Sequence, residues 1–441
     1  MGYQRRISTA AIMILYNAIL WCALPFVVGY HLYRSVSRGR RAALAERFGR
    51  VSPAQVAAVA GQGAIWVHAV SVGETIAAIP LLKALKRNYP ERKILLTNGT
   101  ETGRGVAGKL PEADCTLYFP FDYRFAAARI LSAVQPSLVV IVETEIWPNF
   151  LSTARRLGIP VLLANGRISD RSFPRYLKIA WFFRRVLGNF AALCMQSGVD
   201  GERIIAMGAP AASVFITRNL KYDIPIREVT AKDREGLRER YRLPTGVPVV
   251  IAGSTHQGEE VAVISAYLAI SPERRPAFLV LVPRHPERSP AVAELLSRHG
   301  LPFTRRSELD HRPGDFAPGE VLLVDTIGEL MQLYAIADVV FVGGSLVPTG
   351  GHNVLEPASL GKPVLFGRHM ENFREIAALL IECGGGVQVR DGGELAAMLG
   401  ELLGNADRCR EMGAKGARFI EENGGSTERH MDVIARFLGD G

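Results

Sequence analysis

The chain has 441 residues, of which 48% are apolar and 22% charged, a composition typical of a folded globular protein with an apolar excess. This length exceeds what one hydrophobic core usually holds, so we expect two domains. The formal net charge is +9, but the sequence has neither zinc-finger spacing nor an RNP-like motif, which argues against nucleic acid as a partner.

The first predicted element is an apolar helix at the N-terminus. Residues 8–30 contain no charged side chain, and such a run can cross a hydrocarbon core of roughly 30 Å as a helix, kinked by Pro25 but not ended by it. A cleaved signal peptide would have a shorter apolar run and a small-x-small cleavage site. We therefore predict a single membrane anchor over residues 1–34, either spanning or monotopic.

The charges that flank this segment predict its orientation. Two arginines precede it and six follow within twenty residues of its end, so the positive-inside bias leaves the bulk of the protein in the cytoplasm. The cysteines agree with a reducing compartment, because they are odd in number, widely spaced and form no C-x-x-C pair. They are Cys22, Cys115, Cys194, Cys383 and Cys409.

Positive charge is concentrated in the first half. Up to Pro225 there are 28 Lys and Arg against 13 Asp and Glu, whereas the remainder has 24 against 30. This asymmetry predicts an anionic partner for the first half, and for an anchored protein the anionic membrane surface, or a phosphorylated lipid in it, is such a partner. The residues expected to meet lipid phosphates are Arg40, Arg41, Arg47, Arg167 and Arg171.

After the anchor, apolar strand-like runs alternate with amphipathic helical stretches, a pattern that predicts parallel sheets built from βαβ units. The first series begins with "AIWVHAV" and ends with "AALCMQS"; the second begins with "PVVIAGS" and ends with "GVQVR". Between them lies a charged stretch with little strand character. The prediction is an α/β protein of two Rossmann-like domains with an interdomain cleft, over residues 35–225 and 226–441.

Polar clusters follow many of these strands, where ligands bind in parallel sheets. In "HAVSVGE", Glu74 opens a helix directly after a strand. A carboxylate there can be a helix-dipole partner worth a few tenths of a kcal/mol, or a catalytic base at the mouth of a cleft. From this segment alone both interpretations stay open, and the rest of the chain has to decide between them.

The segment "PTGGHNVLEPASLGKPVLFG" carries the most chemical information. Gly350 and Gly351 allow close approach of the backbone to a ligand, and the helix that follows offers free N–H groups to a phosphate. Asn353 and Glu356 are one turn apart, and the Glu356 carboxylate suits two ribose hydroxyls. Pro357 is tolerable in the first turn of a helix.

These glycines, with the E-P and G-x-P-V that follow, resemble the nucleotide-binding segment of GT-B glycosyltransferases. The wider set is similar to one family, the 3-deoxy-D-manno-octulosonic acid (Kdo) transferases, in "HAVSVGE", "ETEIWPN", "NGRISDRS", "GSTHQGEE", "PRHPER" and "GGHNVLEP". The resemblance implies an inverting transfer of Kdo from CMP-Kdo to a phosphorylated lipid A precursor in lipopolysaccharide synthesis, at the bacterial inner membrane. It also implies that no metal or other cofactor takes part, and the sequence has no D-x-D pair.

The resemblance assigns roles to single residues. Glu74 becomes the general base, and Glu143 or Glu145 the second carboxylate, although strand alternation leaves open which of the two faces inward. From their chemistry, Arg284 is expected to meet the CMP phosphate, because guanidinium pairs bidentately with phosphate. Lys221, near the expected cleft, is expected to meet the Kdo carboxylate or the phosphate, the alternative being an exposed lysine of the linker. The residues expected to contact CMP or lie close to it are Pro283, Arg284, Gly328, Glu329, Leu330, Asn353, Val354, Leu355, Glu356, Ser254, Thr255 and His256.

Three alternatives remain at this stage. His256, His285 and His352 invite a metal site, but no carboxylate spacing supports one. Another GT-B enzyme, a UDP-sugar transferase or an epimerase, would share the architecture. A non-catalytic, membrane-anchored lipid-binding protein would keep the fold without depending on Glu74.

Overall fold

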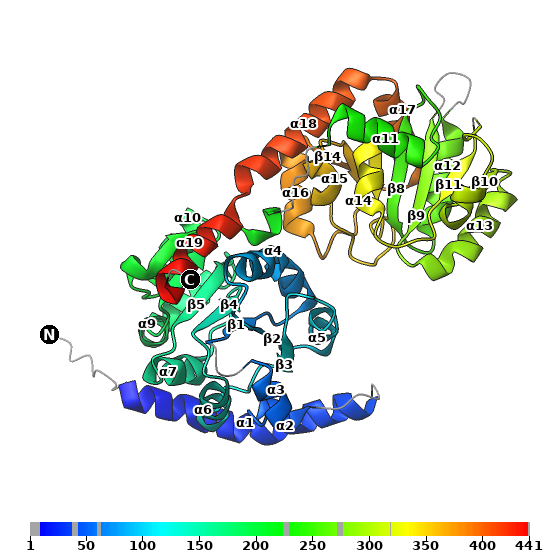
Figure 1. The fold of residues 1–441 in the computed structure, drawn as a ribbon. Helices are drawn as coiled ribbons and strands as arrows, with labels where there is room; N and C mark the ends of the chain where they lie inside the picture. Colours follow the sequence, from blue (N-terminus) through cyan, green and yellow to red (C-terminus); the bar gives the residue numbers. More distant parts are fainter. Residues whose placement is uncertain are drawn as a thin grey trace. The chain divides into compact units, whose positions relative to one another are not determined.

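The computed structural model describes residues 9–37, 43–59, 63–223, 229–270, 277–317 and 319–439. It divides into two compact units, Met1–Asp223 with Gly425–Gly441, and Ile224–Gly424 (Figure 1). Each unit is a seven-stranded, fully parallel sheet with helices on both faces. The predicted α/β class with two Rossmann-like domains is therefore confirmed.

The sheet of the first unit has the strand order β3-β2-β1-β4-β5-β6-β7. Its central strands are runs of Val, Ile and Leu that are buried along their whole length, as a sheet covered on both faces requires. The strands are β1 (Ile65–His68), β2 (Ile94–Asn98), β3 (Cys115–Tyr118), β4 (Leu138–Val142), β5 (Val161–Gly166), β6 (Ala192–Met195) and β7 (Val214–Ile216).

Helices cover the two faces of this sheet in separate layers. Side chains of α6, α7 and α9 belong to the core on one face, and those of α4 and α19 to the core on the other. The helices are α1 (Thr9–Ser37), α2 (Leu44–Arg47), α3 (Pro53–Ala57), α4 (Val72–Asn88), α5 (Glu101–Ala107), α6 (Arg124–Val134), α7 (Pro148–Arg156), α8 (Phe173–Lys178), α9 (Ala180–Leu187), α10 (Gly198–Ala206) and α19 (Ser426–Leu438), with short 3₁₀ turns η1 (Ala211–Ser213) and η2 (Leu220–Tyr222).

The sheet of the second unit has the order β10-β11-β9-β8-β12-β13-β14. Its strands are β8 (Val249–Thr255), β9 (Phe278–Pro283), β10 (Phe303–Arg305), β11 (Val321–Leu323), β12 (Val339–Val342), β13 (Val364–Phe366) and β14 (Gly386–Gln388). Its helices are α11 (Ala231–Arg240), α12 (Glu259–Ala269), α13 (Ser289–Arg298), α14 (Leu330–Ile336), α15 (Leu355–Ser359), α16 (Arg374–Glu382), α17 (Gly392–Leu403) and α18 (Ala406–Asn423), with η3 (Pro286–Arg288) and η4 (Arg306–His311).

The last helix does not belong to the second unit. The predicted second domain, 226–441, includes α19, but the contacts of α19 are with the first unit. Asp223 accepts hydrogen bonds from the backbone N–H groups of Ser426 (3.0 Å) and Thr427, and Ser426 donates to the Arg218 carbonyl. The predicted boundary is corrected on this point, because a return of the chain leaves no signal in local composition.

The apolar N-terminal segment forms α1, which continues through Pro25. Within the part of the chain that the structure describes, α1 is the one helix whose length and composition suit a membrane span, over Met13–Tyr33 with a mean hydropathy of 1.7. It runs along the first unit beside α6 and α7 (Figure 1).

Candidate active site

The topology of each sheet marks one position where a ligand is expected. In the first unit the connections change direction between β1 and β4, and in the second between β8 and β12. In open parallel sheets, ligands bind beyond the carboxyl ends of the strands at such a switch point. Glu74 follows β1, and Glu143 and Glu145 follow β4.

The three carboxylates line one pocket in the first unit. Glu143 and Glu145 enter it from the turn after β4, and Glu74 enters it from the first turn of α4. The remaining lining residues follow β4 and β5 or belong to α8; they are Thr144, Arg167, Ser169, Ser172 and Tyr176. The predicted acidic residues are therefore brought together, with hydroxyl groups and one arginine beside them.

Glu74 is held by the start of its own helix. One carboxylate oxygen accepts from the Val70 N–H (2.6 Å) and the other from the Ser71 hydroxyl (2.9 Å), while Ser71 caps α4. This is a helix-capping arrangement, so the structural role considered from the sequence is present. Burial raises the pKa of Glu74 above its usual range; the hydrogen bonds oppose this, and the nearby Glu143 adds to it.

Glu143 and Glu145 both line the pocket because the strand ends before them. Glu143 has a positive φ of 61° and its carbonyl accepts from the Glu145 N–H (3.0 Å), so the chain turns tightly at this point. Strand β4 ends at Val142, so Glu143 and Glu145 are not bound by the alternation of side chains along a strand. Both therefore face the pocket, and the sequence did not have to choose between them. Burial, with Glu74 and Glu143 nearby, raises the pKa of Glu145 to about 7.

Lys221 reaches the same group of acids from η2. Its Nζ lies 3.0 Å from Glu143 Oε1, and both side chains are about one-third exposed. Glu143 is thus partly neutralised, whereas Glu145 and Glu74 form no ion pair with another residue in the part of the chain that the structure describes. The arrangement provides two carboxylates of raised pKa, Glu74 and Glu145, beside the Glu143–Lys221 ion pair.

The predicted donor residues lie in the second unit and follow its central strands. Ser254 and Thr255 end β8, Pro283 ends β9, and the Arg284 N–H donates to the Thr255 carbonyl (2.9 Å). Ser254 has a positive φ of 57°, which is costly for a residue with a side chain and is common at functional sites. A Cβ at Gly343, just after β12, would lie 2.5 Å from the Ser254 carbonyl oxygen.

The segment after β12 brings together the two polar side chains that the sequence places one helical turn apart. Asn353 Nδ2 donates to Glu356 Oε1 (3.2 Å), so these two side chains do face each other. Burial raises the pKa of Glu356, against the effects of Asn353 and Arg284, which places Arg284 in its electrostatic surroundings. The side chains of Val354 and Leu355 are fully buried, so only their backbone could contact a ligand.

The two glycines before this segment are required by packing within the unit, whereas the sequence analysis expected them to allow close approach to a ligand. Gly350 and Gly351 both have positive φ, 97° and 75°. A Cβ on Gly350 would meet the Asn372 amide at 2.3 Å, and one on Gly351 would meet Met370 Sδ at 2.4 Å. Their lack of side chains lets the loop pack on residues 370–372 of its own unit.

Gly328, Glu329 and Leu330 lie at the start of α14. Gly328 has a positive φ of 92°, as its place in a tight turn requires. The Glu329 carboxylate accepts from Arg306 Nε (3.0 Å) and the Tyr241 hydroxyl (3.1 Å). The Glu329 carboxylate is therefore already hydrogen-bonded within the unit, so a ligand at this turn would meet backbone groups.

Three histidines gather beside the donor residues. The Nε2 atoms of His256 and His352 are 2.8 Å apart, and the His285 ring is 5.8 Å from that of His256. Burial lowers the pKa of both bonded rings, that of His352 to about 4, so the pair is neutral near pH 7. Among the described residues, no group of three or more His, Cys, Asp or Glu is arranged to hold a metal.

Glu259 is an organising residue that the sequence did not single out. It is fully buried at the start of α12 and accepts from the backbone N–H groups of His256 (2.9 Å), Gly344 (2.6 Å), Ser345 (2.8 Å) and Leu346 (2.7 Å). It thus ties the loop after β8 to the loop after β12. The available signal was an acidic residue inside "GSTHQGEE", one of the segments that carry the family resemblance, in which this glutamate was given no role.

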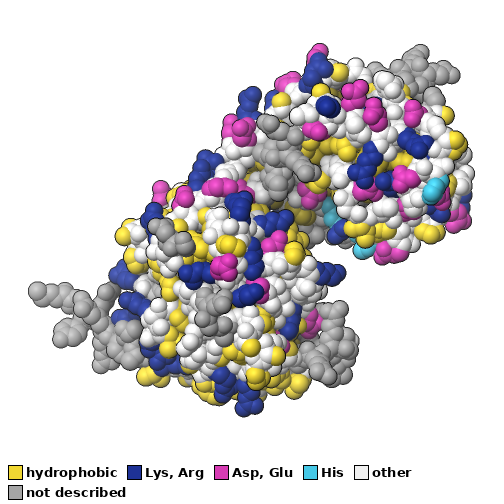
Figure 2. All heavy atoms as spheres, in the orientation of Figure 1, with side chains coloured by type: hydrophobic (Ala, Val, Ile, Leu, Met, Phe, Trp, Pro, Cys, Tyr) yellow, Lys and Arg dark blue, Asp and Glu magenta, His cyan; other side chains and the backbone are white. Residues whose placement is uncertain are grey.

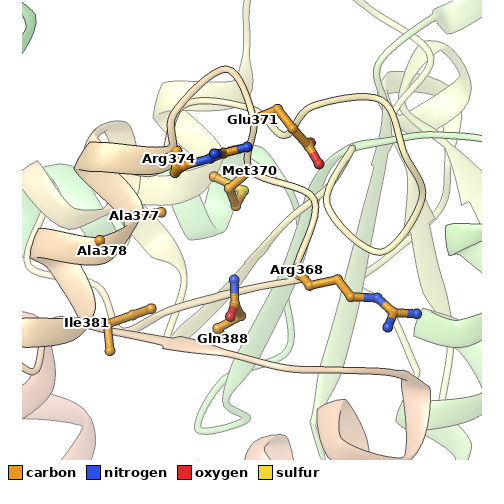
Figure 3. Close-up of a pocket in the computed structure, with 8 residues that line it drawn as sticks. All are labelled: Arg368, Met370, Glu371, Arg374, Ala377, Ala378, Ile381 and Gln388. Carbon is orange, nitrogen blue, oxygen red and sulfur yellow. The ribbon is translucent and has the colours of Figure 1, made fainter. Parts of the chain in front are cut away.

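A further pocket of the second unit lies at the ends of β13 and β14 (Figure 3). Its polar lining residues are Arg368, Glu371, Arg374 and Gln388, and its apolar ones are Met370, Ala377, Ala378 and Ile381; in Figure 3 the Arg368 guanidinium points away from the others. Gly351 packs against Met370, so this pocket adjoins the loop that contains the predicted donor residues. The sequence interpretation did not include it.

The arginines predicted to meet lipid phosphates have different surroundings. Arg47 is only 6% exposed, stacks on the Tyr118 ring at 4.2 Å and donates to the Gly99 carbonyl (2.9 Å), so its assignment to the membrane surface is wrong. Arg167 lines the carboxylate pocket and Arg171 is exposed. Arg40 and Arg41 lie outside the described residues.

The two seven-stranded parallel sheets, each with its strand-end site, define the two-domain GT-B fold class. A solved glycosyltransferase from Rickettsia africae ESF-5 shares this fold, with a TM-score of 0.50 and 14% identity over 86% of this chain and all of that one. A family model described as 3-deoxy-D-manno-octulosonic-acid transferase (kdotransferase) matches residues 42–224.

Two relatives extend this similarity over nearly the whole chain. The 3-deoxy-D-manno-octulosonic acid transferase of Haemophilus influenzae is 35% identical, covering 96% of this chain and 98% of its own length. The enzyme of the same description from Bordetella pertussis is 35% identical, over 89% of this chain and 91% of its own. The chain belongs to the 3-deoxy-D-manno-octulosonic acid transferase family and is a glycosyltransferase.

Proposed function

We propose that this protein transfers Kdo from CMP-Kdo to a hydroxyl group of a phosphorylated lipid A precursor, with inversion and without a metal ion. Family membership supports the transferred sugar. The observation that carries the mechanism is the convergence of Glu74, Glu143 and Glu145 in one pocket at the switch point of the first sheet.

Glu74 is the proposed general base. Its carboxylate takes the proton of the acceptor hydroxyl, the hydroxyl oxygen bonds to the anomeric carbon of Kdo, and the bond from that carbon to the CMP phosphate oxygen breaks. A raised pKa suits this role, because a carboxylate with greater proton affinity is a better base as long as it stays ionised. Glu143 with Lys221, and Glu145, provide the charges that face the developing oxocarbenium-like centre.

The second unit supplies the proposed donor site. Arg284 meets the phosphate of CMP, which carries more negative charge as the bond breaks, and Glu356 accepts from the ribose hydroxyls. The backbone at Gly328–Leu330 and Asn353–Leu355, with the strand-end residues Ser254–His256 and Pro283, completes the contacts. Glu259 keeps two of these loops together without touching the ligand.

The acceptor is proposed to be a lipid of the cytoplasmic face of the inner membrane. The carboxylate pocket offers Arg167, Ser169 and Ser172 beside the acids, groups that suit hydroxyl and phosphate oxygens. The exposed arginines of this unit and the apolar α1 are suited to an anionic bilayer.

The test is replacement of Glu74 by glutamine, which keeps the size but cannot take a proton. Incubated with CMP-Kdo and tetra-acylated lipid A precursor, the variant should transfer sugar at least about a hundredfold more slowly, since general-base catalysis contributes roughly 10²–10⁴-fold. Product mass is the measurement. CMP affinity should be unchanged, and stability should fall by about 1 kcal/mol or less through the weakened cap.

The matched control is Glu91→Gln, a change at an exposed glutamate beyond the other end of α4, which should transfer at the wild-type rate. A folded Glu74→Gln protein with activity within tenfold of wild type would reduce Glu74 to its capping role.

A further inference from the structure

The residues of α1 separate into two faces with the period of a helix. Positions 13, 16, 17, 20, 23, 24, 27, 28 and 31 are partly buried, and the positions between them are exposed. Spacings of three and four residues mark one continuous stripe. The helix therefore lies against the first unit over most of its length, from Met13 to His31, a distance of roughly 27 Å at about 1.5 Å per residue.

Polar groups hold the helix in this position. Tyr16 donates to Asp122 (2.7 Å), a carboxylate only 4% exposed, and Asn17 exchanges hydrogen bonds with the buried Asn149. Further along, the Leu20 carbonyl accepts from the Tyr123 hydroxyl (2.7 Å). These bonds satisfy polar atoms that would otherwise be buried without a partner.

Aromatic contacts continue the attachment. Trp21 stacks on Phe125 and meets Tyr123 edge-on, with centroid distances of 6.1 Å and 5.4 Å. His31 packs on Phe121 at 5.3 Å. The contacts of α1 with the first unit thus extend from Tyr16 to His31, on both sides of Pro25. Detaching one part of the helix would break contacts in that part.

The opposite face of α1 is apolar and open. The exposed fractions are 61% for Leu15, 59% for Ile19, 79% for Phe26 and 72% for Tyr33. Hydrophobic side chains line the edge of the first unit along which α1 runs, with Lys and Arg beside them (Figures 1 and 2). Neighbouring α9 carries Trp181, which is 49% exposed, and its Phe182 meets Tyr16.

The helices on this face carry charge of one sign. The sequences of α1, α6, α7, α8 and α9 contain no Asp or Glu. Six arginine and lysine side chains on α6, α8 and α9 are exposed; they are Arg124, Arg129, Arg175, Lys178, Arg184 and Arg185. An apolar strip bordered by cations matches an anionic bilayer, with acyl chains beneath and phosphates at the rim.

We infer that α1 lies in the plane of the membrane as a monotopic helix, and that both of its ends remain on the side of the first unit. A helix that crossed the bilayer would draw Arg124 and Arg129 toward the hydrocarbon, at a cost of a few kcal/mol each. Detachment instead would break the bonds of Tyr16 and Asn17. The in-plane arrangement keeps every contact and exposes only the apolar face to lipid.

This placement also gives the acceptor a route. Ser172, just before α8, and Tyr176, within α8, line the carboxylate pocket. Helices α8 and α9, with the residue between them, also expose Leu177, Ile179 and Trp181. A lipid headgroup at the bilayer surface would therefore reach the acids beside α8. This part of the inference rests on the proposed function, whereas the orientation of α1 does not.

The test uses the full-length protein with a protease site and epitope tag ahead of Met1 and a second site after Gly441. In inverted inner-membrane vesicles both sites should be cut, and in intact spheroplasts neither should be. Cleavage of the N-terminal site from the spheroplast exterior would show that α1 spans the membrane and would overturn the inference. The C-terminal site serves as the control for sidedness.

A depth measurement tests the orientation independently. Nitroxide labels at positions 15, 22 and 26, in a chain whose other cysteines are replaced and whose fold is verified, should lie at similar depths in the bilayer. A spanning helix would change depth by about 1.5 Å per residue between them. If Kdo transfer fails but the depths agree, the proposed function fails and the orientation stands.

Discussion

Glu74 combines an observed capping position with the proposed role of general base, and its proton affinity depends on its surroundings at that position. The Ser71 hydroxyl and the Val70 N–H stabilise the ionised carboxylate, whereas burial and Glu143 destabilise it. The balance leaves a pKa above the usual value. A base of this kind loses activity as the pH falls through its pKa, so the acidic limb of the rate profile reports the balance.

Replacing Ser71 by alanine should shift that limb. The change removes a hydrogen bond of 2.9 Å to the ionised form, so the pKa of Glu74 rises further and the acidic limb of kcat/KM moves to higher pH. The lost cap should also cost about 1 kcal/mol of stability. The profile is measured from pH 5 to 9 with saturating CMP-Kdo.

Ser52→Ala is the matched control, because Ser52 caps α3 with its own capping box. It should cost similar stability and leave the pH profile in place. An unshifted profile in Ser71→Ala would mean that a group other than Glu74 controls the limb.

On the donor side, Arg284→Ala and Glu356→Ala should each weaken CMP binding. Loss of a charge-assisted partner in a partly closed site costs about 1.5–3 kcal/mol, or roughly ten- to a hundredfold in affinity. Calorimetry with CMP measures it. The control is Arg390→Ala, at an exposed ion pair of the same unit, which should bind CMP as the wild type does. Unaltered CMP affinity in both Arg284→Ala and Glu356→Ala would contradict the assignment of the CMP site to this unit.

At the scale of elements, α19 returns to the first unit and is held there by a buried histidine. His430 Nδ1 donates to the Ser426 carbonyl (2.8 Å), and Nε2 accepts from the Asn165 N–H (3.0 Å). A proton on Nε2 would face that N–H group. Burial accordingly lowers the pKa of His430 to about 4.

The stability of the first unit should therefore depend on pH through His430. Its folded pKa lies below the unfolded value near 6.5, so its contribution is complete above pH 6.5 and declines as the pH falls toward 4, by on the order of 2–3 kcal/mol. His430→Gln should flatten this part of the curve. All four tryptophans belong to the first unit, so urea unfolding followed by their fluorescence measures it.

His299→Gln changes an exposed histidine of the second unit and should keep the wild-type pH dependence. Equal slopes in wild type and His430→Gln would show that His430 does not carry the effect.

For the whole molecule, charge follows the division into units. The first unit, with α19, has 30 Lys and Arg against 16 Asp and Glu, and the second has 22 against 27. Exposed charges act over about 8 Å at physiological ionic strength and are screened by added salt. The positive unit is the one that contains α1 and the carboxylate pocket.

Raising salt from 0.05 to about 0.5 M should therefore raise the KM for the lipid acceptor in anionic vesicles several-fold and change CMP affinity little. In vesicles of neutral lipid the effect of salt on KM should largely vanish. A salt dependence that is equal for both ligands would argue against acceptor binding at the positive unit.

Local sequence determined the elements and their chemistry. Buried runs such as "LVVIV" predict parallel strands covered on both faces, and polar residues directly after them predict strand-end sites; β4 and Glu143 meet both expectations. The 23-residue uncharged run at 8–30 predicted an apolar helix in the same way. Each of these patterns involves residues that are close together in the chain, so it can be recognised without knowledge of the fold.

Only the tertiary structure decided which distant groups meet. The turn at Glu143 places two acids in the pocket of Glu74, Arg47 is buried under Tyr118, and α19 leaves the second unit for the first. Asp122 and Asn149 hold α1 to the domain, although the sequence of α1 by itself is that of an anchor. These outcomes depend on burial and hydrogen bonding between residues far apart in the chain, and no local pattern records them.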